Sequence, residues 1–162
     1  MKRKKIRQFA RNKLDEITSK SFDEKEILKE SPSRNLVEEI KKALQGLIYI
    51  SETDAEILPF VGTTTEKVDR EEIVKQTKAA SDAPVEEKEF SAFFARLTEI
   101  QDWFGDEEKE TARRYAALKE ILEKNIRDLK VFKIGKIELD IYVAGLDSEN
   151  TFLGIKTKSV ET

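Results

Sequence analysis

The feature that most constrains the fold is a long amphipathic helix pattern followed directly by an alternating strand pattern. From Asp106 to about residue 129, apolar side chains recur every three or four positions, which predicts one long helix. From Ile137 to Val143, apolar and polar side chains alternate with the period of a half-buried strand. Gly135 and the turn 145–150 separate this strand from further strands at 131–134 and 151–158. Antiparallel hairpins beside a long helix predict an α+β protein.

Shorter elements precede this pattern. Ser33 and Asp69 are candidate N-caps, and Gly46 is a candidate helix stop. The run at 47–50 is continuous and rich in β-formers, so we predict a buried strand there. Together the elements predict an α+β sandwich, in which a mainly antiparallel sheet carries helices on its faces. The predicted ranges are helices at 33–44, 69–79 and 89–97, strands at 47–50 and 55–60, and a loop at 62–65.

The chain contains no histidine and no cysteine. Histidine is the commonest acid–base group at neutral pH and the commonest transition-metal ligand, and cysteine supplies thiolates. Zinc sites, Ser-His-Asp hydrolysis and histidine-dependent phosphodiester cleavage therefore lack their usual groups. Carboxylate chemistry with Mg²⁺ is the enzymatic hypothesis that stays open. We predict that the protein is not an enzyme and has no cofactor of its own.

Charge is distributed unevenly along the 162 residues. Residues 1–30 hold 10 Lys/Arg against 6 Asp/Glu, whereas residues 31–162 hold 20 against 27. We therefore predict a basic, helical or partly flexible arm at 1–32 and an acidic globular domain at 33–162. Such a domain repels nucleic acid and attracts basic proteins. No apolar run approaches the roughly 20 residues that span a bilayer, and no signal-peptide pattern follows the basic start, so we expect a cytoplasmic protein without a membrane partner.

Three places carry side chains that a packed core does not need. Glu52 follows the strand at 47–50, Asp102 precedes the only tryptophan, Trp103, and Thr162 ends the chain just after a strand. Each has a structural interpretation, as a solvated turn, a half-buried aromatic plug or a frayed end. Each also has a functional one. A carboxylate can meet a cation, tryptophan often anchors an interface, and hydroxyl and carboxylate oxygens suit Mg²⁺.

These places lie within a series of segments that occur in the same order in one known family. The segments are GLIYISE at 46–52, QT at 76–77, DAP at 82–84, FFAR at 93–96, QDWF at 101–104, GKIELDIYV at 135–143 and the end VET at 160–162. From about Leu36 to Thr162 the chain thus resembles the nuclease A inhibitor family, whose members block sugar-nonspecific, magnesium-dependent endonucleases.

The resemblance implies an α-β-α sandwich similar to the pathogenesis-related-1 proteins, although their histidine-containing site cannot exist in a chain without histidine. It also implies that Glu52 enters the nuclease cleft and that Asp102 and Trp103 touch the enzyme beside it. An oxygen of Thr162 is then expected to reach the catalytic metal ion. The only metal expected is the Mg²⁺ of the target nuclease, which the inhibitor meets in the complex.

An alternative function uses the same scaffold differently. The chain could be a non-inhibitory interaction module whose basic arm binds nucleic acid or an acidic partner, since the first thirteen residues hold seven bases and no acid. We expect no nucleic-acid binding except through this arm. Residues 1–35 have no recognised counterpart in the family, and the loop at 54–67 differs from it, so regulation and nuclease specificity do not follow from the resemblance.

Overall fold

The computed structural model describes residues 31–161, and the chain divides between Arg34 and Asn35 into two units. Most of the predicted basic arm, and Thr162, lie outside the described residues. No helix in the described part is long and apolar enough to cross a membrane. The elements are α2 (Pro32–Leu44), β1 (Ile48–Ile50), β2 (Asp54–Glu56), β3 (Leu58–Thr64), α3 (Arg70–Thr77), β4 (Val85–Glu89), α4 (Phe90–Thr98), α5 (Asp106–Asn125), β5 (Arg127–Gly135), β6 (Glu138–Leu146) and β7 (Thr151–Val160).

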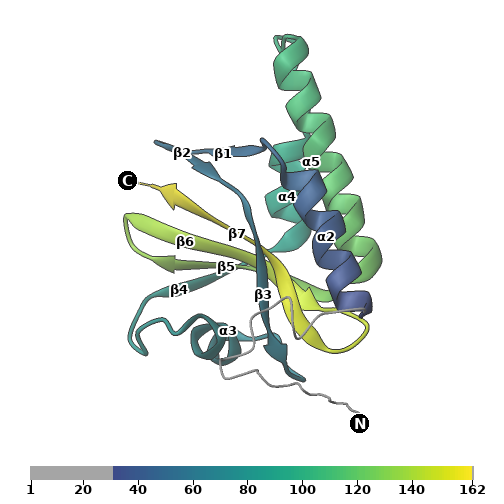
Figure 1. The fold of residues 1–162 in the computed structure, drawn as a ribbon. Coiled ribbons are helices and arrows are strands. Elements are labelled where there is room, and N and C mark those ends of the chain that lie inside the picture. Colours follow the sequence, from purple (N-terminus) through teal and green to yellow (C-terminus); the bar gives the residue numbers. More distant parts are fainter. Residues whose placement is uncertain (1–30, 162) are drawn as a thin grey trace, which may run out of the picture. The chain divides into compact units, whose positions relative to one another are not determined.

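Five strands form one antiparallel sheet in the order β3-β7-β6-β5-β4, and β1 and β2 form a separate two-stranded sheet (Figure 1). The central ladder joins β6 to β7, from Glu138 opposite Val160 to Leu146 opposite Phe152. Hairpins of this kind come from consecutive strands with short turns, as the alternating pattern predicts. The predicted α+β class with a mainly antiparallel sheet is confirmed.

One face of the sheet is covered by α4 and α5. Ile141, Val143 and Ile155 point to this face, where they meet aromatic side chains of both helices. Phe94 of α4 and Tyr115 of α5 are both buried, with ring centroids 6.5 Å apart. Figure 1 shows α2 running beside α5, and the Arg114 guanidinium donates a hydrogen bond to the Ala43 carbonyl oxygen at 3.0 Å.

The opposite face is covered at one end by α3. Its buried Ile73 packs in a cluster that contains Phe60, Phe132 and Phe152. The predicted cap of this helix is correct, because the Asp69 carboxylate accepts the Glu72 N–H at 2.8 Å. Helices therefore lie on both faces of the sheet.

Two predicted helix ends are wrong. Ser31, not Ser33, caps α2, since the Ser31 hydroxyl accepts the Arg34 N–H at 3.1 Å and proline takes the first helical position. The long helix ends at Asn125 rather than near residue 129. Asp128 adopts a positive φ of 58°, at a register shift where β5 begins.

Three strand predictions also need correction. The strand at 47–50 is not buried in the main sheet, because β1 pairs only with β2 and the Ile50 side chain is 72% exposed. The residues predicted as a loop from Gly62 onward continue β3 as far as Thr64. Strand β4 was not predicted, because four of its five side chains are charged and exposed, as suits the edge of a sheet.

Candidate functional site

Glu52 lies at the tip of the β1–β2 hairpin. The tip is ordered by its own hydrogen bonds, since the Ser51 N–H and hydroxyl both donate to the Thr53 carbonyl oxygen, at 3.0 and 3.1 Å. The base of the hairpin is held by an aromatic pair, in which Tyr49 stacks on Phe93 of α4 at 5.9 Å and 12°. The side chain of Glu52 is therefore presented on a short, supported turn rather than a long loop.

The hairpin tip is hydrogen-bonded to the last residues of β7. The Glu52 N–H donates to the Val160 carbonyl oxygen at 3.4 Å, and the Val160 N–H donates to the Ser51 hydroxyl at 3.0 Å. A third bond joins β2 of the hairpin to β7, from the Thr157 hydroxyl to the Glu56 carbonyl oxygen at 2.8 Å. Figure 1 shows the hairpin beside the end of β7. Two segments more than one hundred residues apart are thus brought together.

Of the two residues predicted at this place, only Glu52 is described, because Thr162 lies outside the described residues. Its neighbour Glu161 is described. The Glu161 N–H donates to the Ile137 carbonyl oxygen at 2.9 Å, so the chain is held on its other side by the β5–β6 turn. The end of β7 therefore runs between the β1–β2 hairpin and the β5–β6 turn.

Electrostatics at this end of the sheet favour an ionised Glu161. Burial raises its pKa, but hydrogen bonds from the Ser159 hydroxyl and the Lys133 ammonium outweigh burial and leave the pKa below its usual value. Burial raises the pKa of Tyr49, the Glu161 charge raises it further, and Arg96 opposes both. The carboxylate is therefore charged and the phenol neutral at physiological pH.

Asp102 and Trp103 occupy the loop between α4 and α5. The Trp103 side chain is 74% exposed, and its ring meets Phe104 edge to face at 4.7 Å. The loop is closed by a bond from the Phe104 N–H to the Gln101 carbonyl oxygen at 3.1 Å, and the Gly105 N–H donates to the Glu108 carboxylate at 2.9 Å. The structural interpretation of Trp103 as a half-buried plug is wrong, because most of the ring faces solvent.

The tryptophan loop and the hairpin tip remain distinct places. Within residues 31–161, no hydrogen bond or ion pair joins Asp102 or Trp103 to the hairpin. In Figure 1 the start of α5, which follows the loop, lies at the top of the view, away from the end of β7. The link between them is α4, because Phe93 stacks on Tyr49 and the same helix leads into the loop. The structure thus joins Glu52 to the end of β7 and leaves the Trp103 pair on a neighbouring loop.

Two exposed isoleucines near the chain end were missed in the sequence. Ile50 belongs to the hairpin, and Ile137, which is 56% exposed, belongs to the β5–β6 turn, so the two flank the end of β7. Large exposed apolar side chains beside polar groups are typical of interface cores. The sequence predicts a buried strand for Ile50 and the apolar face of a half-buried strand for Ile137. Ile50 is exposed because β1 lies outside the main sheet, and Ile137 is exposed because it precedes β6, which begins at Glu138.

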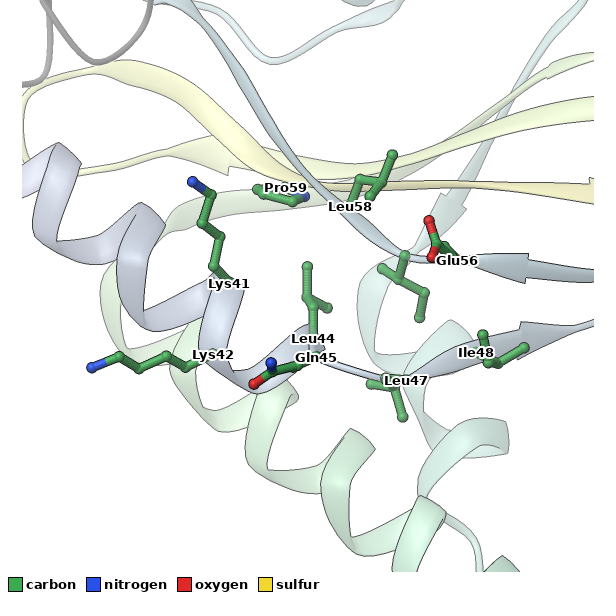
Figure 2. Close-up of a pocket in the computed structure, with 11 residues that line it drawn as sticks. Lys41, Lys42, Leu44, Gln45, Leu47, Ile48, Glu56, Leu58 and Pro59 are labelled. Carbon is green, nitrogen blue, oxygen red and sulfur yellow. The ribbon is translucent and has the colours of Figure 1, made fainter.

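The structure also contains a hollow of about 460 Å³ between the end of α2 and strands β2 and β3. Figure 2 shows Leu44 pointing from α2 toward β3 and Lys42 directed away from the hollow. None of the predicted site residues lines it. Among residues 31–161, no three acidic side chains lie close enough together to hold a metal ion.

Comparison with known proteins agrees with the sequence resemblance. No curated protein matches the chain in a sequence search. The family model described as nuclease A inhibitor-like protein matches residues 34–162, which include the hairpin, the tryptophan loop and the end of β7. Because this match covers most of the chain, the protein belongs to the nuclease A inhibitor-like family.

Proposed function

We propose that the protein inhibits a sugar-nonspecific, metal-dependent nuclease by filling its active-site cleft. Membership of an inhibitor-like family supports a nuclease as the partner. The observation that carries the proposal is the pair of hydrogen bonds between the hairpin tip and Val160. These bonds hold the backbone of Ser51 and Glu52 next to the end of β7.

The chemistry of a nuclease cleft explains why such a place would inhibit. The cleft holds phosphate oxygens with a divalent cation and positively charged side chains. Carboxylate and hydroxyl oxygens can take the place of those phosphate oxygens, and they offer no phosphodiester bond to cleave. In this proposal Glu52 enters the cleft, and an oxygen of Thr162 reaches the nuclease-bound Mg²⁺.

The tryptophan loop supplies a second contact beside the cleft. Trp103 exposes a large rigid ring, and such rings dominate binding energy when they become buried in an interface. Acidic residues flank it in the sequence, with Asp102 in the loop and Asp106, Glu107 and Glu108 in the first turn of α5. This negative charge would steer the inhibitor toward a cationic cleft.

The test is an inhibition assay against the non-specific nuclease of the same source, with single alanine variants. Glu52→Ala and Trp103→Ala should each weaken inhibition by about 2 kcal/mol or more, as central anchors do. Asp54→Ala and Ile100→Ala are matched controls, because each removes an exposed side chain from the same hairpin or the same loop. Control variants that lose as much potency as the test variants, or test variants with wild-type potency, would refute the assignment.

A further inference from the structure

Glu161 is held from three directions. Its N–H donates to the Ile137 carbonyl oxygen at 2.9 Å, the Ser159 hydroxyl donates to its carboxylate at 2.8 Å, and the Lys133 ammonium lies 3.1 Å from the same carboxylate. The Lys133 side chain is only 15% exposed, so solvent and salt screen this ion pair less than they screen a surface pair. A glutamate that served only solubility would need none of these contacts.

The Lys133–Glu161 ion pair links two strands that are not neighbours in the sheet. Lys133 belongs to β5 and Glu161 follows β7, whereas β6 lies between them. Neighbouring strands are about 4.8 Å apart, so the backbones of β5 and β7 lie roughly 10 Å apart. Lys133 therefore ties the end of β7 to a strand with which β7 forms no ladder.

The end of β7 is polar on one face. Thr157, Ser159 and Glu161 are spaced by two residues, so they share a face, and Ser159 is 1% exposed. A buried hydroxyl is costly unless it is hydrogen-bonded. The Ser159 hydroxyl meets this cost by donating to Glu161, which makes the carboxylate part of the packed sheet rather than a solvated chain end.

We propose that Glu161 is a positioning residue which, held by Lys133 and Ser159, fixes the end of β7 beside the β1–β2 hairpin before the nuclease binds. The inference rests on the proposed function, because it concerns how the cleft-filling segments are prepared. Segments that are already ordered lose less conformational entropy on binding. Glu161 thus acts through the chain end and not by touching the nuclease.

The first measurement is amide hydrogen exchange of the unbound inhibitor. Lys133→Met keeps the length of the side chain and removes its charge, and Glu161→Gln does the same at the other partner. Both should speed exchange of the Val160 and Glu161 amides by up to about fivefold, because a partly exposed charged hydrogen bond that holds the segment is lost. Lys158→Met is the matched control. It removes the same charge from an exposed pair with Asp140, one residue from Ser159, and should leave these amides unchanged. Unchanged exchange in both test variants would overturn the proposal.

The second measurement is inhibition in a chain extended by Gly-Ser-Gly after Thr162. Lys133→Met should weaken inhibition by up to about fivefold in the original chain, because the end of β7 is then less ordered before binding, and should have little effect in the extended chain. An equal loss in both backgrounds would mean that Lys133 acts on the nuclease directly, which would overturn the positioning role. So would equal potency of Lys133→Met and Lys158→Met.

The two measurements separate the inference from the function on which it rests. Absence of inhibition by the wild-type chain would refute the proposed function, together with the role of Glu161 in nuclease binding. The exchange rates would still decide whether the Lys133–Glu161 pair holds the end of β7.

Discussion

The two halves of β7 differ in what their side chains contact. In the first half, Phe152, Leu153 and Ile155 are buried among apolar groups on both faces of the sheet. In the second half, Thr157 and Ser159, followed by Glu161, make polar contacts with the β1–β2 hairpin and with β5. One strand therefore stabilises the fold at one end and orders a polar surface at the other. Substitutions along it should separate stability from inhibition.

Phe152→Ala should have the largest effect, and on stability. Its ring is fully buried and meets Phe60 edge to face at 5.7 Å, so truncation removes apolar contact and leaves a cavity. We expect a loss of about 3–5 kcal/mol in the free energy of unfolding, measured by urea denaturation. Potency per folded molecule should be unchanged. A loss under about 1 kcal/mol would show that the first half of β7 is not the stabilising half.

Thr157→Val tests the boundary between the halves. Valine keeps the shape of the side chain but removes the hydroxyl that donates to the Glu56 carbonyl oxygen at 2.8 Å. We expect a loss of about 1–2 kcal/mol in unfolding free energy, since the carbonyl oxygen loses its partner. Amide exchange in the hairpin should also quicken. Thr151→Val, at the start of the same strand, is the comparison variant. If it quickened amide exchange in the hairpin equally, the distinction between the two halves of β7 would be contradicted.

The smallest expected effect is a pH dependence at the chain end. The pKa of Glu161 is lowered in the fold, so its contribution to stability is complete above the ordinary glutamate value of 4.5 and is lost as pH falls through the folded pKa. The groups around it are the ammonium groups of Lys133 on β5 and Lys88 on β4, which favour the charged carboxylate, and the phenol of Tyr49 on β1, whose pKa is raised.

Because the Glu161 side chain is 40% exposed, we expect at most about 1 kcal/mol from this pair. The difference in unfolding free energy between the wild type and Glu161→Gln should shrink as pH is lowered from about 6 to about 3. Carbon-detected NMR of the Glu161 carboxylate gives the pKa directly. A difference that is constant with pH would show that this carboxylate is not held in its charged form.

Much of the fold could be predicted because its local signals agree with its packing. The capped helix after Asp69 and the strands on both sides of the 145–150 turn carry strong periodicity or capping signals. Two features could not be predicted for a physical reason. Strand β4 is charged because it lies at an edge, and β1 is apolar although it pairs outside the main sheet. Periodicity reports which side chains are apolar, not which strands they join.

The candidate site was only partly accessible from the sequence. Glu52 and Trp103 could be singled out by residue type and by resemblance. The sequence offers no local signal that Lys133 pairs with Glu161 across an intervening strand, because register decides which side chains meet.

The separate β1–β2 sheet has a consequence for how such an inhibitor could diversify. It shares no ladder with the five-stranded sheet and is attached by a few hydrogen bonds and one aromatic stack. Its tip could therefore be exchanged or lengthened, by evolution or by grafting, without repacking the hydrophobic core. A single scaffold could in this way be retargeted to different enzymes.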